Sequence, residues 1–287
     1  MIMDLEWNTT YSHKRKGFFN EIIEIGAVKL DQNLVLKDRY QQFVCTQVSK
    51  KLTGHVKQMT GINMDDLAGG KPLMQALVGF RKWIGPADTV ILTWSATDLM
   101  VLLDNLKYFS GRGTHIPFMR RYVDLQRLCD VAMAAQKQTG LKVMADMLEI
   151  DSSDLDAHRA VDDCLLCARI FERLYDETAL QKAIQITDKH FYRRLFFKPY
   201  FLSKKSSRLI PKGSFDFDCP VCSCPAQPLE EFQFKNHAFF ARFSCGDCQQ
   251  DFIGQLKAKK TYDEVKILKR TLPIKAPEPE EEPETKT

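Results

Sequence analysis

Apolar runs and apolar residues at helical spacing alternate along the first part of the chain. Patterns typical of strands occupy residues 1–8, 21–30, 40–46 and 89–94. Helical spacing predicts helices over 51–67, 73–84, 99–109, 122–136 and 141–148, and a last helix that ends near Tyr175. Because the first three strands follow one another with short connections, we expect an antiparallel meander. Strands interspersed with helices in this way predict an α/β domain.

The first strand ends in two acids. Asp4 and Glu6 are two residues apart, and side chains on a strand alternate between its faces, so both point the same way. Neighbouring carboxylates repel each other and raise each other's pKa unless a cation neutralises them. Mg²⁺ or Mn²⁺ suits such hard oxygen ligands. The alternative is a solvated strand end that carries two acids and no metal.

A third acid follows the strand at 89–94. Asp98 comes directly after the apolar run, at the predicted start of the next helix. It can serve as an N-cap or as a first-turn acid that the helix dipole favours. It can equally supply a further carboxylate at the C-terminal tip of a buried strand, where ligand sites in open sheets tend to lie.

The last helix of this part contributes an acid and a histidine. Asp163 lies beside the apolar stripe of that helix, whereas Asp162 lines up with its more polar face. An acid on the core-facing side is unfavourable unless a cation meets it, so Asp163 is the metal-ligand candidate. His158 stands five residues earlier, where a loop-borne imidazole can reach over the same site. Its alternative is a capping or surface histidine.

Composition sets outer bounds on the protein class. Fractions of 44% hydrophobic and 27% charged residues are ordinary for a folded protein of 287 residues, long enough for a sizeable domain and a small module. The net charge of +4 implies nothing by itself. Residues 276–287 form an acidic, proline-rich tail that we expect to be disordered. No apolar stretch is long enough for a membrane helix, so we expect a cytoplasmic protein without membrane contact.

Four of the nine cysteines form two C-x2-C pairs, Cys219/Cys222 and Cys245/Cys248, with 22 residues between the pairs. Thiolates in this arrangement are typical of a structural Zn²⁺ site, and zinc would stabilise so small a module directly. Cys224 has no assigned partner. A further pair, Cys164 and Cys167, lies on an apolar helix stripe and reads as buried thiols.

Basic and aromatic residues alternate between 189 and 212. Such a segment can neutralise phosphates and stack on bases, as a track for a single strand does. The alternative is a connector whose aromatic residues pack on a domain and whose charges face water. Phenylalanines and basic residues also lie between the two cysteine pairs. They can contact substrate or a partner protein, and the acidic tail is a second candidate for binding a protein.

Together these positions resemble the DEDDh, or DnaQ-like, 3′–5′ exonucleases. The resemblance rests on D-x-E at Asp4 and Glu6, an acid at Asp98, and H-x4-D at His158 and Asp163. Supporting segments are 21–28, similar to the family's second strand, 59–62, similar to its T-G-I turn, and 141–150. The forms D-L-E-W-N and T-W-x-x-x-D look closest to bacterial exonucleases related to sporulation-pathway inhibitors. Trp7-Asn8 after the glutamate and the absence of N-x-x-F-D depart from the common pattern.

The resemblance implies an RNase H-like mixed sheet flanked by helices over 1–178. A basic and aromatic connector at 179–213, a zinc ribbon at 214–262 and a C-terminal segment at 263–287 follow. It further implies two Mg²⁺ or Mn²⁺ ions held by the four carboxylates, with His158 as general base. Substrate contacts are expected from six residues: Leu5, Trp7, Asn8, Thr60, Gly61 and Ile62.

The expected activity is removal of nucleoside 5′-monophosphates from the 3′ end of a single strand. RNA is favoured as substrate because the branch that the sequence resembles consists of stand-alone exonucleases and no polymerase segment is present. Two alternatives are a DNA exonuclease acting in repair or proofreading, and a scaffold that binds nucleic acid with little turnover.

Overall fold

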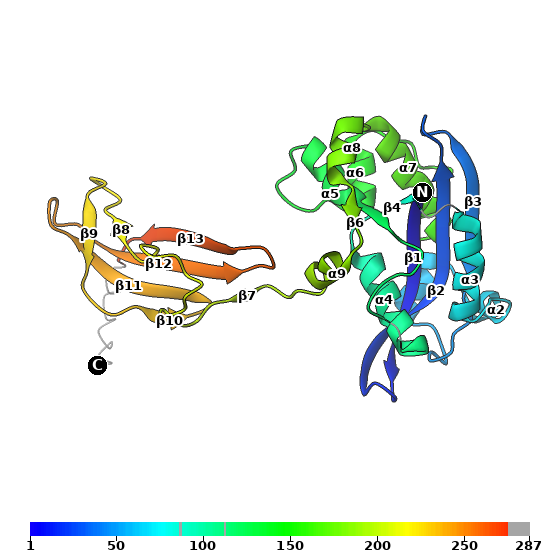
Figure 1. Ribbon diagram of the computed structural model, residues 1–287, viewed down its shortest axis with the longest axis horizontal. Coiled ribbons are helices and arrows are strands. Elements are labelled where there is room, and N and C mark those ends of the chain that lie inside the picture. The colour runs from blue at the N-terminus through cyan, green and yellow to red at the C-terminus, as the bar shows by residue number, and fades with distance from the viewer. Residues whose placement is uncertain (86–87, 112, 275–287) are drawn as a thin grey trace, which may run out of the picture. The chain divides into compact units, whose positions relative to one another are not determined.

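The computed structural model describes residues 1–85, 88–111 and 113–274. The chain divides into two compact units, Met1–Phe196 and Phe197–Thr287 (Figure 1). This division falls later than the boundary expected after residue 178. The acidic tail at 276–287, for which disorder is predicted, lies outside the described residues. No described helix combines the length and the apolar character that a bilayer span requires.

The first unit is built on a six-stranded mixed sheet in the order β3-β2-β1-β4-β5-β6. Its strands are β1 (Ile2–Ser12), β2 (Gly17–Leu30), β3 (Leu36–Phe43), β4 (Val90–Thr93), β5 (Arg121–Asp124) and β6 (Gln185–Ile186). The expected antiparallel meander is present as β1, β2 and β3. β1, β4 and β5 run parallel to one another, and β6 is antiparallel to β5. The predicted α/β class with a mixed sheet is therefore confirmed.

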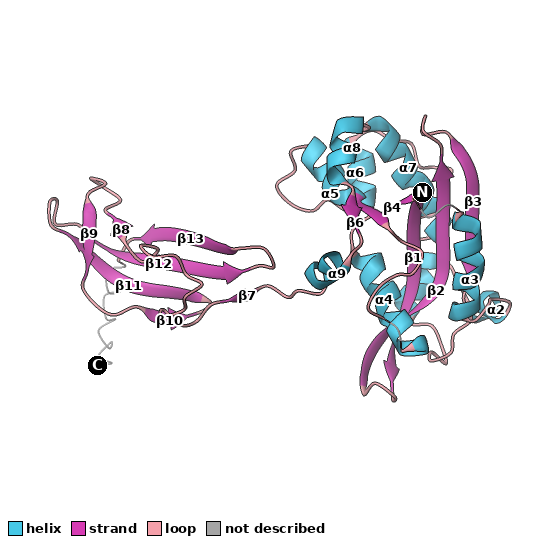
Figure 2. Cartoon of the chain, viewed as in Figure 1, coloured by secondary structure: helices cyan, strands magenta, loops and turns pink. Residues whose placement is uncertain are grey.

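Helices cover both faces of this sheet (Figure 2). Helices α3 (Leu73–Ile84), α4 (Thr97–Ser110) and α9 (Lys189–Leu195) pack with one face in a first apolar core. Helices α5 (Leu125–Ala132), α6 (Leu141–Met147) and α7 (Ala160–Arg173) pack with the other in a second core. The remaining helices are α1 (Gly54–Thr60), α2 (Met64–Ala68) and α8 (Glu177–Ala183). The sheet is thus buried on two sides, and polar groups can gather where its strands end.

Helix α7 approaches the sheet most closely at Gly26 in β2. A Cβ atom built on Gly26 would lie 2.2 Å from the carbonyl carbon of Ala160, the first residue of α7. Real Cβ atoms do not approach backbone this closely, so only glycine permits the contact. Asp4 lies directly opposite Gly26 across the β1–β2 pair. The glycine therefore brings the start of α7 over the strand that carries the first acid.

Two predicted elements differ in the structure. β1 and β2 continue as a hairpin as far as Ser12 and Gly17, whereas the strand patterns of the sequence end at residue 8 and begin again at residue 21. Residues 121–124 form the strand β5, whereas a helix was predicted to begin at Tyr122. Asp124 ends that strand and caps α5 by accepting the backbone N–H of Arg127. A four-residue buried strand that runs straight into a helix has no period of its own, so the helical pattern concealed it.

The second unit is a small, mostly antiparallel β structure. Its sheet has the order β13-β12-β11-β9-β8, with β10 paired to β11 and β7 paired to β12. The strands are β7 (Tyr200–Phe201), β8 (Phe217–Asp218), β9 (Pro225–Pro228), β10 (Gln233–Lys235), β11 (Ala238–Cys245), β12 (Asp251–Lys260) and β13 (Val265–Leu272). β7 and β13 lie outside the expected 214–262 ribbon, so the module is larger than the cysteine spacing indicates.

The predicted 179–213 connector is divided between the two units. Phe191 and Tyr192 of α9 are buried in the first core, and the Tyr192 hydroxyl accepts the backbone N–H of Ile116 at 3.0 Å. These aromatic rings belong to the fold of the first unit. Their burial removes them from the predicted single-strand track.

Candidate active site

All five positions of the D-x-E, Asp98 and H-x4-D motifs line one pocket of about 470 Å³. They come from three separate parts of the first unit: β1 supplies Asp4 and Glu6, the first turn of α4 supplies Asp98, and the region around the start of α7 supplies His158 and Asp163. Ligand atoms of Glu6, His158 and Asp163 all lie within 4.8 Å of one another. The structure thus brings together groups that are up to 159 positions apart in the chain (positions 4 and 163).

A side-chain hydrogen bond ties Asp98 to β1. Its Oδ1 accepts the backbone N–H of Leu5 at 3.1 Å, between the two acids of the strand. Ser95, two residues after β4, has φ 89°, in a region that residues other than glycine rarely adopt. The Ser95 hydroxyl accepts the backbone N–H of Thr97 at 3.2 Å, and its carbonyl accepts the Thr93 hydroxyl. This strained turn aims the start of α4 at the tip of β1.

An ion pair between Arg159 and a buried carboxylate positions the second half of the site. The Glu24 carboxylate is fully buried and lies opposite Glu6 in the β1–β2 pair. It accepts hydrogen bonds from Nη2 of Arg159 at 3.0 Å and from the backbone N–H of Ala160 at 3.2 Å, and so it holds the start of α7 against β2. His158, the residue before Arg159, has φ 62°. Glu24 and Arg159 therefore set where His158 and Asp163 stand relative to Glu6.

Burial is the main cause of the raised pKa values at this site. It raises the pKa of Glu6 to about 8 and that of Asp98 to about 7, with repulsion from Asp163 adding to both. The pKa of Asp4 also rises well above its usual range through burial, and the charge of Asp98 adds to it. Burial likewise raises the pKa of Asp163, which the nearby His158 partly offsets. A set of acids held at such values can accept divalent cations once ionised.

The expected substrate-contact residues divide into two groups. Leu5, Trp7 and Thr60 line the pocket. Asn8 is fully buried, and its side chain bonds to Ser49 and to the backbone of residues 51 and 53, so its assignment to substrate binding is corrected to a structural role.

Two residues of the T-G-I turn serve the fold in the same way. Ile62 is 1% exposed and packs in a small apolar cluster, which also corrects its assignment. Gly61 closes α1 with φ 68° and is not among the lining residues. A backbone in this left-handed region favours glycine.

Pattern reading did not single out several further lining residues. His55, Val56 and Met59 project from α1. Ser95 lies in the turn before α4 and Thr97 is the first residue of that helix. Thr9, Trp94 and Leu141 complete the wall. Glu24 was also missed, although a glutamate inside the otherwise apolar run 22–28 is itself a signal of a paired buried charge.

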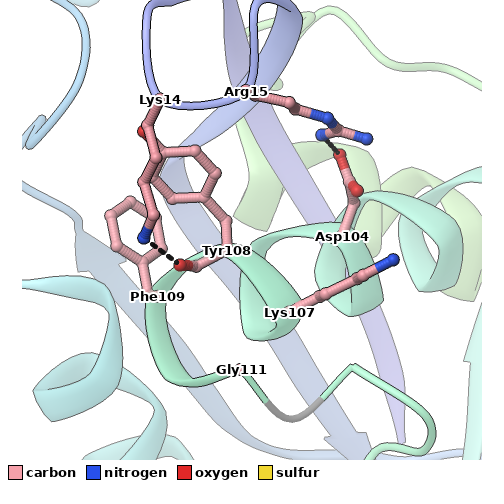
Figure 3. A pocket seen from close by; sticks show the side chains of 7 residues that line it. All are labelled: Lys14, Arg15, Asp104, Lys107, Tyr108, Phe109 and Gly111. Carbon is pink, nitrogen blue, oxygen red and sulfur yellow. Dashed lines mark hydrogen bonds and ion pairs between the residues drawn. The ribbon is translucent and has the colours of Figure 1, made fainter.

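A second cavity of about 510 Å³ lies beside the tip of the β1–β2 hairpin (Figure 3). The Lys14 ammonium donates a hydrogen bond to the Tyr108 carbonyl at 3.3 Å, and its Nζ lies 4.8 Å from the centroid of the Tyr108 ring. Arg15 pairs with Asp104 on α4. Two cations at the tip of the hairpin thus fasten it to α4.

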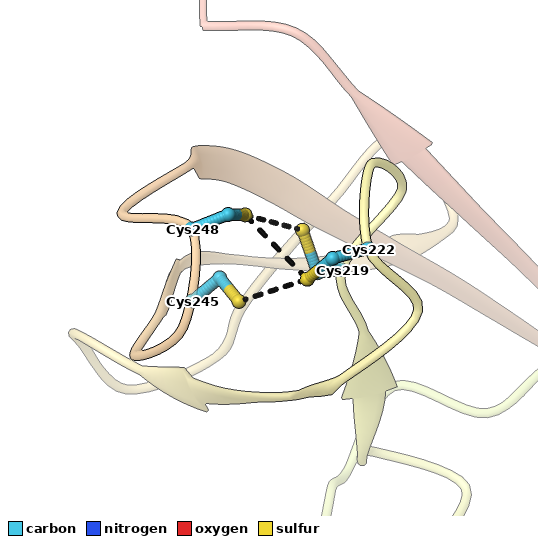
Figure 4. Close-up of side chains that lie close together, drawn as sticks. All are labelled: Cys219, Cys222, Cys245 and Cys248. Carbon is cyan, nitrogen blue, oxygen red and sulfur yellow. Dashed lines mark hydrogen bonds between the residues drawn. The ribbon is translucent and has the colours of Figure 1, made fainter.

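The four cysteines predicted as zinc ligands converge in the second unit (Figure 4). Sγ–Sγ distances are 3.4 Å for Cys219–Cys248 and Cys222–Cys245, and 3.5 Å for Cys222–Cys248. A tetrahedron of 2.3 Å Zn–S bonds has edges of about 3.8 Å, so the donor set fits Zn²⁺ closely. Hydrogen bonding from the backbone N–H of Cys224 lowers the pKa of Cys222 to about 7, which favours the thiolate.

The two cysteine loops have the same backbone geometry. The N–H of Ser223 donates to the Cys219 carbonyl at 2.9 Å, and that of Gln249 donates to the Cys245 carbonyl at 3.0 Å. Ser223 and Gln249 each have φ 59°. Each loop therefore curls around its first cysteine in the same manner. Cys164 and Cys167 are buried in the second core of the first unit, as expected of thiols that pack.

The mixed sheet and its acid-lined pocket are those of an α/β nuclease domain. The model of the family described as Exonuclease (RNase_T) matches residues 2–171, and the chain belongs to this family. The 3′–5′ exoribonuclease 1 of Rattus norvegicus is 26% identical over 168 residues, and that of Homo sapiens 25%. These matches cover 56% of this chain and 48% of each relative, so the chain spans about half the length of the curated relatives it matches.

Solved structures agree on the fold. The nuclease domain of 3′hExo, a DEDDh family member bound to rAMP, superposes with a TM-score of 0.53 at 23% identity, covering 66% of this chain and 96% of that one. Cell-death related nuclease 4 (CRN-4) has a TM-score of 0.52 at 18% identity, covering 71% and 68%. The predicted RNase H-like class and the resemblance to DEDDh exonucleases are confirmed.

Proposed function

We propose that the protein is a metal-dependent 3′–5′ exonuclease that releases nucleoside 5′-monophosphates from single-stranded nucleic acid. The observation that carries this proposal is the meeting of Asp4, Glu6, Asp98, His158 and Asp163 in one pocket. RNA is the favoured substrate because the curated relatives are named as exoribonucleases.

The donor chemistry supports a pair of divalent cations, Mg²⁺ or Mn²⁺. Four carboxylates face one pocket, and Arg159, the cation beside them, already pairs with Glu24. Their raised pKa values reflect burial and charge repulsion that the surrounding residues compensate only in part. Oxygen donors of this kind suit hard cations. When bound, the two cations would supply Lewis acidity to the attacking water and to the leaving oxygen.

The protein's own residues divide the remaining work. Asp4, Glu6, Asp98 and Asp163 would hold the cations beside the scissile phosphate. His158 accepts the proton of the attacking water, for which its place beside Glu6 and Asp163 is suitable. As the new P–O bond forms, the bond from phosphorus to the 3′ oxygen of the penultimate nucleotide breaks.

The pocket wall suits a terminal nucleoside. Trp7 on β1 and Met59 on α1 are apolar groups that can pack on a base, and His55 and Thr60 add polar atoms beside them. Aromatic contact with a base contributes about 1–3 kcal/mol and tolerates any sequence. The wall therefore selects an accessible end rather than a particular base.

In the second unit we propose one structural Zn²⁺ held by Cys219, Cys222, Cys245 and Cys248. The spacing of their sulfur atoms and the matched loops around them support it. The small buried core of this unit makes a metal crosslink important for its stability.

A time course on 5′-labelled single-stranded RNA and DNA of one sequence, with Mn²⁺, tests the catalytic proposal. The wild-type protein should give a ladder that shortens from the 3′ end, and His158→Ala should slow it on the order of 10²-fold or more. His13→Ala, on the hairpin and outside the pocket, is the matched control and should keep the wild-type rate. The faster ladder identifies the preferred substrate. Tight binding without any ladder would favour a scaffold and contradict the enzyme.

A further inference from the structure

The two faces of the sheet in the second unit differ sharply in character. Along β12, Phe252, Leu256 and Ala258 are buried on one face, and the residues between them lie on the other. Leu202, Ile210 and other apolar groups cover the first face and complete the core of the unit. The second face has no such cover within the described residues of its unit.

Strand pairing identifies what this outer face carries. Arg270 of β13 lies opposite Gln255 of β12, which lies opposite Phe240 of β11. Outward positions in the same alternation bring together six cations: Lys235, Arg242, Lys257, Lys259, Lys266 and Arg270. Successive rows along the strands are about 7 Å apart, and each row contributes one or two of these cations.

Positive charge on this face is compensated only in part within the protein. Four of the six cations form no ion pair within the described residues, while Lys266 lies 3.7 Å from Glu264, which directly precedes β13. Lys259 lies directly opposite Lys266, an arrangement that destabilises a sheet. Among the outward positions described on β11, β12 and β13, Asp251 is the one acid, and it lies 4.0 Å from Arg242. Such a surface gains free energy when a polyanion binds and releases its counterions.

Apolar groups stand among the cations. Leu268 and Leu272 of β13 are 48% and 37% exposed, and Phe240 is half-buried between them and β10. A duplex presents mainly phosphates to a flat surface and would leave these side chains without a partner. A single strand presents phosphates together with unstacked bases, which can pack on apolar side chains.

We propose that this outer face, formed by β10, β11, β12 and β13, binds single-stranded nucleic acid. Its cations hold the phosphates, and Phe240 with the leucines of β13 packs on bases. The surface is distinct from the pocket of the first unit. Because the two units share one chain, a strand held on this face would raise the local concentration of 3′ ends near the pocket.

The experiment is a binding measurement on the full-length chain with fluorescent oligo-rU and oligo-dT of roughly 20 nucleotides, longer than a typical site. Every protein carries Asp98→Asn, so that no strand is degraded during the titration. The test variant has Lys257→Glu, Lys259→Glu and Arg270→Glu. The control has the same charge change at three exposed cations of the first unit, two on α3 and one on α8: Arg81→Glu, Lys82→Glu and Lys182→Glu.

The test variant should bind at least about tenfold more weakly at 0.1 M salt, while the control changes by less than about threefold. The slope of log affinity against log salt should fall by roughly 2, because three phosphate contacts at about 0.7 each are lost. Zinc content and melting of both variants check the fold, and Lys→Gln and Arg→Gln at the same three positions replace the test variant if it loses zinc.

Equal weakening by both variants, or none by the test variant, would overturn the proposal. Displacement of the oligonucleotide by polyglutamate of equal charge, as readily as by unlabelled oligonucleotide, would assign the face to an acidic protein segment instead. Comparison of oligo-rU with oligo-dT shows which nucleic acid the face prefers. Since binding is read without turnover, the result stands whether or not the pocket proves to be an exonuclease.

Discussion

Replacing Asp98 by asparagine should change catalysis and stability in opposite directions. Asparagine has nearly the same shape, and its Oδ1 can still accept the Leu5 N–H, which Asp98 accepts at 3.1 Å. The link between β1 and α4 is therefore kept. The carboxylate charge, which we propose helps to hold the cations, is removed.

The size of the stability change follows from the pKa. Burial raises the pKa of Asp98 from 3.8 to about 7, so at pH 8 the folded protein holds an ionised group at an unfavourable site. At 1.36 kcal/mol per pKa unit, shared among coupled acids, the substitution should stabilise metal-free protein by about 2–4 kcal/mol. For a unit of this size that corresponds to a rise in Tm of roughly 4–16 °C. The rate should fall on the order of 10²–10³-fold.

The change in stability is measured by a melting curve in chelator, and the change in rate by the 3′-end ladder with Mn²⁺. Asp104→Asn, on the same helix but half-buried, outside the pocket and paired with Arg15, is the control and should leave the rate near wild type. An Asp98→Asn protein that keeps a near-wild-type rate would remove Asp98 from the catalytic site. One that melts well below the wild type would refute the electrostatic account of its burial.

Three further predictions concern the zinc, the packing of α7 and the pH response. Cys245→Ser should release zinc and unfold the second unit while the first unit keeps its melting transition, whereas the control Cys224→Ser should keep the metal. An unchanged zinc content in Cys245→Ser would contradict the ligand assignment. Gly26→Ala should destabilise the first unit by about 1–3 kcal/mol and slow the ladder by displacing α7, whereas Gly17→Ala, with open space around its Cβ position, should do neither. Burial raises the pKa of Glu6 from 4.5 to about 8, so the folded protein retains a proton that the unfolded chain releases. Metal-free stability should therefore fall as pH rises between these values, and Mg²⁺ should reduce the fall; a chelated protein that becomes more stable over this range would contradict it.

Local periodicity was sufficient to predict much of the pocket. Alternation on a strand places Asp4 and Glu6 on one side, and helical phase distinguishes Asp163, which lines the pocket, from Asp162, which does not. Spacing alone likewise indicated the four cysteines that converge. These features depend on residues a few positions apart, which is the range over which backbone geometry is fixed.

Contacts between residues far apart in the sequence could not be predicted in this way. The pairing of Glu24 with Arg159 joins residues 135 positions apart, and sequence offers only the hint of a charged residue in an apolar strand. Asn8 follows the D-x-E motif, a position that suggests a substrate contact. In the structure, however, residues 49, 51 and 53 form hydrogen bonds with its side-chain amide. A polar side chain can contact substrate only where other parts of the chain do not bury it, and those parts are distant in the sequence.

The edges of the elements were the weakest part of the prediction. β13 carries two cations and two leucines on its outer side and pairs with the sheet through β12. Its alternation of apolar and polar residues therefore gives little indication of a strand. β5 is too short to show a period before α5 begins. Edge and short strands are defined by their neighbours, and the neighbours come from distant parts of the chain.

The most direct test of the central claim is a crystal of the full chain grown with Mn²⁺ and a nucleoside 5′-monophosphate, measured for anomalous scattering of manganese. We expect two peaks about 4 Å apart among Asp4, Glu6, Asp98 and Asp163, with the phosphate between them and His158 facing it. Manganese bound elsewhere, or a pocket that stays empty of metal at saturating Mn²⁺, would contradict the proposal that these carboxylates form a two-metal exonuclease site.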